Sequence, residues 1–117
     1  HSQCGAMSAL IDPEQVRGLP YLSVWLEHAR AAAEILADGA EATDLSQRVD
    51  QAIRANVLVQ LQNLRTHPSV AAGLQAGWLE LHGWVYRFET GEVLAHDPHR
   101  NAFVPLRERY PEGLASA

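Results

Sequence analysis

At 117 residues, with 47% of them hydrophobic and a net charge of −5, the chain is long enough for one folded domain and too apolar to be disordered. Its nine basic residues are all arginines scattered along the chain, which argues against a nucleic-acid surface, and no apolar run approaches the roughly 20 residues that cross a bilayer. No secretory signal is visible, and the single cysteine excludes an intrachain disulfide framework, so the composition predicts a soluble, cytoplasmic protein whose one domain spans residues 1–117.

The first half of the chain has the periodicity of helices. "GAMSALIDP" predicts a short helix that Pro13 ends. The apolar spacing in "YLSVWLEHARAAAEILADG" predicts a longer helix that begins near Pro20 and ends at Asp38-Gly39. Thr43 is the expected N-cap of a third helix, in which an apolar stripe runs from residue 45 to about residue 65.

The pattern changes after a further short helix, which is expected between Pro68 and Gly77. "WLELHGWVYRF" is rich in aromatic and β-branched residues and is apolar on both parities, which predicts a strand covered on both faces. "ETGE" predicts a turn and "EVLAH" the partnering strand of a hairpin. The proline-punctuated segment 97–117 is expected to run over the surface. Two strands are marginal as an independent sheet, so the sequence predicts a helix-rich chain with an incomplete sheet.

The chain opens with "HSQCGAM", a candidate metal-binding motif. Zinc binds cysteine thiolate and histidine nitrogen, usually through four ligands in total. His1 and Cys4 can supply two of these ligands from one loop, so at least one more has to come from elsewhere. By spacing alone the signal is weak, and an initial His-Ser is also the remnant that a purification tag leaves behind.

The other histidines have structural explanations. His28 is expected on the solvated flank of its helix, His67 is placed to cap the helix that starts at Pro68, and His82 is expected in a structural hydrogen bond. "HDPH", which contains His96 and His99, looks like a metal cluster but is better explained as an exposed turn. The tryptophans are expected in the core, namely Trp25, Trp78 and Trp84.

Several stretches together match one known family. "HSQCGAM" is similar to a His-x-x-Cys-Gly zinc motif, "LPYLSVWLEHARAAAEIL" to the long helix that follows it, and "NLRTHP" with "LHGWVY" to a C-terminal signature. In these features the chain resembles the β-class carbonic anhydrases, over residues 1 to about 106, and most closely the bacterial type associated with cyanate metabolism. The resemblance implies an α/β fold with a mainly parallel sheet flanked by helices. This chain would be the C-terminal part of that single domain, helix-rich with one C-terminal β-hairpin.

The resemblance also implies a function, the zinc-dependent reversible hydration of carbon dioxide to bicarbonate in a homodimer or higher homo-oligomer. It assigns His1 and Cys4 as zinc ligands and Gly5 as a substrate contact through its backbone N–H. The chain departs from the family because the first motif, Cys-x-Asp-x-Arg, is absent from it. That motif supplies the other thiolate and an aspartate–arginine pair, so we expect no catalytic residue in this chain and no activity from it alone.

Two explanations of this departure stay open. The chain could be the C-terminal portion of a longer enzyme, in which His1 follows a buried strand, and this is the explanation that we favour. Alternatively, it could be a non-catalytic interaction module with a vestigial metal site. Neither explanation involves nucleic acid or a membrane.

Overall fold

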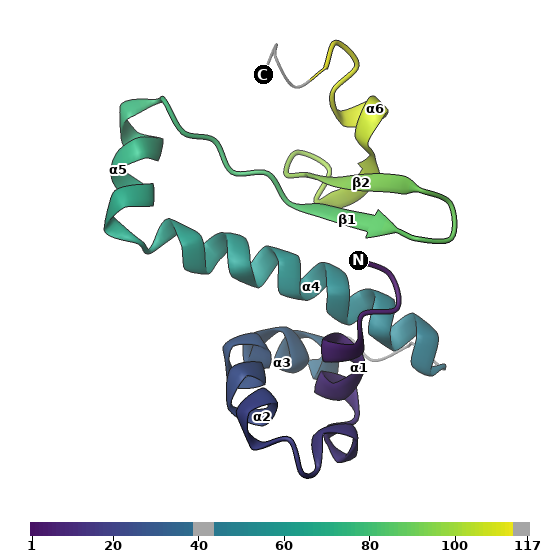
Figure 1. Ribbon diagram of the computed structural model, residues 1–117. Coiled ribbons are helices and arrows are strands. Elements are labelled where there is room, and N and C mark those ends of the chain that lie inside the picture. The colour runs from purple at the N-terminus through teal and green to yellow at the C-terminus, as the bar shows by residue number, and fades with distance from the viewer. Residues whose placement is uncertain (39–43, 114–117) are drawn as a thin grey trace.

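A long helix, α4 (Leu45–Arg65), separates a helical layer from a small sheet (Figure 1). The computed structural model describes residues 1–38 and 44–113. On one side of α4 lie three short helices, α1 (Gly5–Ile11), α2 (Pro20–Leu26) and α3 (Arg30–Asp38). On the other side lie the strands β1 (Trp84–Arg87), β2 (Glu92–Asp97) and β3 (Ala102–Pro105), with α5 (Pro68–Ala76) and α6 (Leu106–Arg109) at the ends of the connecting segments. None of the helices in the described ranges combines the length and the apolarity that crossing a bilayer requires.

Helix α4 has the bounds that its apolar stripe predicts. The Asp44 side chain is its N-cap and accepts a hydrogen bond from the backbone N–H of Gln47 at 3.1 Å, which satisfies one of the free donors of the first turn. The predicted cap, Thr43, lies outside the described residues. The first half of the stripe is buried at Val49, Ala52 and Ile53, so this part of α4 contributes a wall of the core.

The predicted helix over residues 20–38 is interrupted. A 3₁₀ turn, Glu27–Ala29, separates α2 from α3, and it leaves both Leu26 and Ala29 buried in the core. Pro20 occupies the first turn of α2 as predicted, because its missing N–H has no partner there in any helix. The short helix before Pro13 is confirmed as α1, and a second 3₁₀ turn, Pro13–Val16, follows it.

The sheet has three antiparallel strands in the order β1-β2-β3. The prediction of a single hairpin was therefore incomplete, because residues 102–105 pair with β2 instead of running over the surface. Asn101 makes this possible by adopting φ 48° in the turn before β3, a left-handed conformation that asparagine tolerates better than most residues. The first strand is also shorter than predicted, since residues 78–83 do not form part of it, although the Gly83 carbonyl oxygen accepts a hydrogen bond from the His96 N–H.

One face of β1 is open. Val85 is 1% exposed, whereas its neighbours Trp84 and Tyr86 are 41% and 43% exposed. The prediction of a strand covered on both faces was wrong for this chain, because α4 covers one face of the sheet only (Figure 1). The placement of Trp84 in the core was wrong for the same reason. Trp25 of α2 and Trp78, which follows α5, are also outside the core, at 56% and 72% exposed.

Helix α5 begins and ends as the sequence predicts. His67 occupies its N-cap position but makes no capping hydrogen bond through the side chain, so only the position was predicted correctly. Gly77 ends the helix with φ 75°, the left-handed conformation that glycine adopts without a steric cost.

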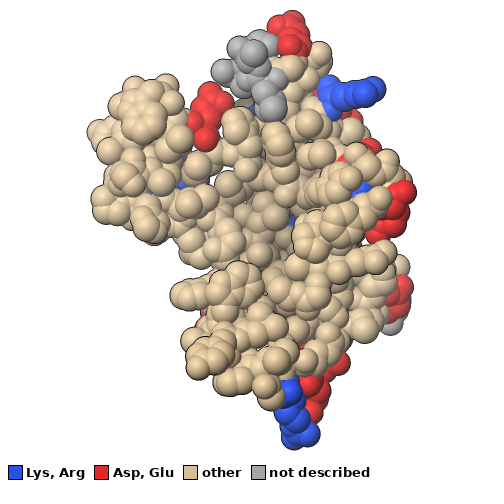
Figure 2. All heavy atoms as spheres, viewed as in Figure 1, with Lys and Arg blue, Asp and Glu red and all other residues tan. Residues whose placement is uncertain are grey.

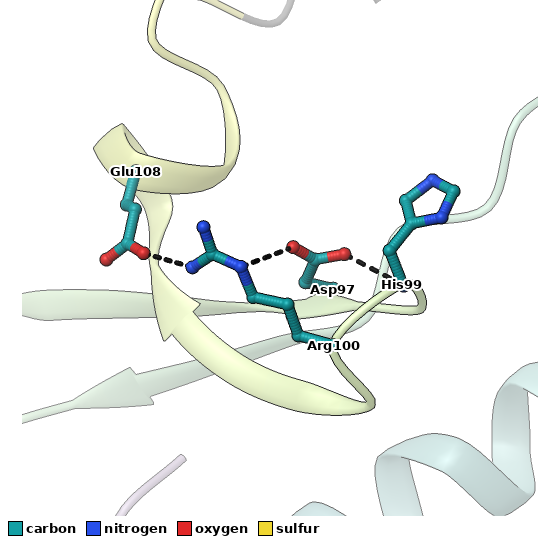
Figure 3. A network of polar contacts seen from close by, with 4 residues as sticks. All are labelled: Asp97, His99, Arg100 and Glu108. Carbon is teal, nitrogen blue, oxygen red and sulfur yellow. Dashed lines mark hydrogen bonds and ion pairs between the residues drawn. The ribbon is translucent and has the colours of Figure 1, made fainter.

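Only Pro98 and His99 of "HDPH" lie in the turn between β2 and β3, and Figure 3 shows the polar contacts that hold this turn. The prediction of an exposed turn is confirmed for His99 and wrong for His96, because His96 belongs to β2 and is partly buried. The Asp97 carboxylate accepts a hydrogen bond from the backbone N–H of His99 at 2.9 Å and pairs with Arg100, which also pairs with Glu108 of α6. Partial burial raises the pKa of Asp97, but the His99 amide and the charges of Arg109 and Arg100 outweigh it and hold that pKa below its usual range. These contacts are structural, and His99 is exposed.

Candidate metal centre

The "HSQC" motif lies against the end of β1. The backbone N–H of Ser2 donates to the carbonyl oxygen of Tyr86 at 2.8 Å, and the Ser2 hydroxyl accepts from the backbone N–H of Phe88 at 2.9 Å. Gln3 Nε2 donates to Glu89 Oε1 at 2.8 Å. Ser2 is only 8% exposed, so its own hydrogen bonds are partly shielded from water, whereas the bond between Gln3 and Glu89 is exposed. Together these bonds fix the motif to the sheet.

The backbone turns sharply inside the motif. Gln3 has φ 53°, a left-handed conformation that costs a residue with a side chain about 1–3 kcal/mol. The turn leads directly into α1, because Cys4 is the N-cap residue of that helix, with φ −65° and ψ 115°. Strain of this kind persists where surrounding contacts over-determine it, and the hydrogen bonds of Ser2 and Gln3 do so here.

His1 is held in one tautomer. Its Nδ1 lies 2.9 Å from the carbonyl oxygen of Ser2, and since a carbonyl can only accept, Nδ1 carries the proton. The other ring nitrogen, Nε2, is then left with its lone pair free. The ring also contacts Phe88, with centroids 4.9 Å apart. A ring N–H bonded to a backbone carbonyl is the arrangement that orients zinc-ligating histidines.

Cys4 is a half-buried free thiol three residues along the chain, and it packs against the core. Imidazole nitrogen and thiolate are both ligands that zinc prefers, so the donor chemistry of His1 and Cys4 fits the predicted metal. Within residues 1–38 and 44–113, no group of three or more histidine, cysteine or acidic side chains is placed to hold an ion. The described chain therefore presents two donors of a larger ligand set.

Gly5 is the first residue of α1 and is exposed. A Cβ atom added there would meet no atom within 4 Å, so packing within the chain does not require glycine at this position. The N–H groups of the first helical turn have no partner within their helix. The structure thus brings the three predicted residues, His1, Cys4 and Gly5, together where the chain passes from the sheet edge into α1.

The motif also borders a hollow of about 840 Å³ between itself, the first half of α4 and the end of β1. Ser2, Gln3 and Glu89 all line it. The Glu89 carboxylate accepts hydrogen bonds from its own backbone N–H, from Ser2 and from Gln3 and lies near Arg87; these outweigh partial desolvation and lower the pKa of Glu89. Sequence reasoning did not single out Ser2 or Glu89, because no local pattern indicates that residues so far apart in the chain will pair.

Known proteins resemble this chain along most of its length. A family model described as carbonic anhydrase matches residues 1–93. The chain is 45% identical over 112 residues to a carbonic anhydrase of Pseudomonas aeruginosa, covering 96% of this chain and 50% of that protein. It is 41% identical over 106 residues to carbonic anhydrase 1 of Escherichia coli O157:H7, covering 91% and 48%.

A solved structure of the beta-carbonic anhydrase CcaA has the same fold. It superposes with a TM-score of 0.85 at 39% identity, and the match covers 90% of this chain and 52% of the other. The chain thus spans about half the length of the relatives that it matches.

Proposed function

Because this chain belongs to the β-class carbonic anhydrase family, we propose that it serves the reversible hydration of carbon dioxide to bicarbonate at a zinc site. The superposition confirms the predicted fold class, and the chain adds a three-stranded sheet where a hairpin was expected. We further propose that residues 1–117 form the C-terminal part of a single domain. The cyanate-associated type stays a prediction.

The observation that carries the proposal is the tautomer of His1. With Nδ1–H donated to the Ser2 carbonyl, Nε2 would bind zinc together with the Cys4 thiolate. Bound zinc would supply a Lewis acid that polarises water and the substrate oxygens. The other thiolate and the aspartate–arginine pair are absent from these 117 residues, and we propose that another segment supplies them. Residues 1–117 alone are then expected to be inactive.

The remaining residues of the motif position this half-site. Ser2 and Gln3 hold His1 at the end of β1 through their bonds to Tyr86, Phe88 and Glu89. The Gly5 N–H would donate to the anionic side of the substrate, and the open space around its Cα atom would let the substrate approach the backbone closely.

We also propose association with a second copy. Figure 2 shows a face on which charged side chains lie mostly along the margins and the centre carries few. Several large apolar side chains are exposed, among them Tyr21, Trp25, Trp78, Trp84 and Phe88. Exposed apolar surface of this kind favours association. A single cysteine used as a thiolate ligand fits a reducing compartment, so we propose a cytoplasmic location.

Zinc content and carbon dioxide hydration, measured on the complete protein, test the proposal. We expect Cys4→Ser and His1→Ala to lose the bound zinc and at least about 100-fold in turnover, because each removes a ligand. His28→Ala, at an exposed histidine in the turn between α2 and α3, should change neither. Full zinc content and turnover in Cys4→Ser would contradict the proposal.

Two further outcomes separate the alternatives. If residues 1–117 alone hydrated carbon dioxide at an enzyme-like rate, the proposal that another segment supplies the remaining zinc ligand would be refuted. A complete protein that binds no zinc but still associates with a partner would favour the non-catalytic interaction module. Its supporting observation is that no group of three or more ligand-type side chains is placed to hold an ion in the described residues.

A further inference from the structure

A second hollow, of about 640 Å³, lies at the other end of α4 from the metal motif. It is bordered by the second half of α4, the extended segment 79–83 and residues of α6 and the turn before β3. Its volume is within the range of small-molecule sites, which is roughly 300–1,000 Å³. Neither His1, Cys4 nor Gly5 borders it, so its use would be separate from the zinc chemistry.

The wall of this hollow is divided by chemical character. One part is apolar and is formed by leucines from α4, α5 and the 79–83 segment, namely Leu58, Leu61, Leu74, Leu79 and Leu81. The other part is polar and includes His82, His96, Arg109 and Tyr110, with Arg65 at the rim. A ligand that fills this space would need an apolar body and a polar head.

Two nitrogens in the polar part have no protein partner. His96 Nε2 and Arg109 Nε are both shielded from solvent, and neither has a hydrogen-bond partner among the residues that the structure describes. Leaving such a group unsatisfied costs about 1–3 kcal/mol, and more when the group is charged. The arginine Nε–H can only donate, and His96 Nε2 donates in its protonated form or in the Nε2–H tautomer. Both nitrogens therefore suit an acceptor.

The one carboxylate in the wall is already engaged. Glu80 Oε2 lies 3.5 Å from His82 Nε2, which places the ring proton on that nitrogen. His82 Nδ1 can then accept from the Tyr110 hydroxyl at 2.6 Å. The charged residues of the wall are two arginines and one glutamate, and the charge of Arg109 also acts on Asp97 behind the wall. The preference for an anion therefore comes from the unpartnered donors of the wall and not from a net positive charge.

We propose that this hollow binds a small organic carboxylate with an apolar body. Its carboxylate would accept from Arg109 Nε and His96 Nε2, and its hydrocarbon part would pack against the leucines. Arginine suits this role because its guanidinium donates in the plane of a carboxylate. Bicarbonate lacks an apolar body and would leave the leucine wall unused.

Hexanoate binding to the complete protein, measured calorimetrically at pH 7, tests this assignment without any use of catalysis. We expect saturable binding that is at least about tenfold tighter than that of 1-hexanol, which lacks the charge, or of bicarbonate, which lacks the chain. Arg109→Gln should weaken hexanoate binding at least about tenfold, which corresponds to roughly 1.4 kcal/mol. Arg107→Gln is the matched control, because Arg107 is an exposed arginine of the same helix and does not line the hollow.

A second variant keeps the test valid if Arg109→Gln fails to fold. Arg65 lies exposed in the last turn of α4, so Arg65→Glu reverses a charge of the wall without disturbing the core, and it should also weaken hexanoate binding. The proposal is overturned if the unmodified protein does not bind hexanoate, if 1-hexanol or bicarbonate binds equally well, or if folded Arg109→Gln and Arg65→Glu both bind as tightly as Arg107→Gln.

Discussion

Gly83, which directly precedes β1, packs closely against α4, and Gly83→Ala tests that packing. A Cβ atom added at Gly83 would lie 2.8 Å from Leu61 Cδ1 and 2.9 Å from Val57 Cγ1. Carbon atoms are most stable about 3.5–4.0 Å apart, so one side must retreat by about 0.7 Å. Val57 cannot rotate away easily, because a β-branched side chain has one strongly preferred rotamer in a helix. The backbone around Gly83 must therefore move.

The expected cost follows from this displacement. Overpacking in a core costs about 1–3 kcal/mol. The shift also strains the hydrogen bond from the His96 N–H to the Gly83 carbonyl oxygen, now 2.8 Å long, of which up to about 1 kcal/mol can be lost. Alanine lowers the conformational entropy of the unfolded chain, which offsets about 0.4–1 kcal/mol of this loss of stability. We expect a net loss of about 1–3 kcal/mol in the free energy of unfolding, or a Tm lower by roughly 4–12 °C for a chain of this length.

Thermal unfolding followed by far-ultraviolet circular dichroism measures the effect. Gly5→Ala is the matched control, because the same Cβ atom meets nothing within 4 Å there and Gly5 is not among the glycines with positive φ. Its Tm should stay within about 2 °C of the unmodified protein. If Gly83→Ala melts together with Gly5→Ala, the close approach of this segment to α4 is not a feature of the folded protein.

Two further predictions concern the core and the metal motif. Val85→Ala removes two buried methyl groups and leaves a cavity, so it should lower the free energy of unfolding in urea by about 2–3 kcal/mol, whereas Val24→Ala, at a position 69% exposed, should change it by less than about 0.5 kcal/mol. The lowered pKa of Glu89 means that its stabilising bonds are present above the ordinary glutamate pKa and are lost as the pH falls through the lowered value. Amide exchange at Phe88, whose N–H donates to Ser2, should therefore accelerate in that acidic range; an equal acceleration in Glu89→Gln would show that Glu89 is not the cause.

Elements encoded by local signals were predicted well. Helix α4 and the helix that Pro68 begins have the expected bounds, because apolar periodicity, prolines and a capping glycine act within a few residues. The third strand was missed because Ala102–Pro105 pairs with β2 only after Asn101 closes the turn. A strand of four residues that ends on a proline carries little signal of its own.

The candidate site divides in the same way. The residues that would bind zinc and substrate, His1, Cys4 and Gly5, belong to one contiguous motif and could be identified from the order of the amino acids alone. The residues that hold the motif in place could not, because Ser2 and Gln3 bond to Phe88 and Glu89 across a separation of 86 positions. The prediction of burial was wrong for Trp84. Both faces of its strand are apolar in the sequence, but only one face is covered in the structure.

The sequence by itself therefore determined α1, α4 and α5, the identity of the motif and the family, since each depends on the order of neighbouring residues. It did not determine α6 or the break between α2 and α3. Only the tertiary structure decided which carboxylate lies beside the motif. It also decided where His96 and Arg109 share a hollow. These features depend on hydrogen bonds, shielding from solvent and close contacts between segments that are distant in the chain, and such contacts exist only after the sheet and α4 have packed together.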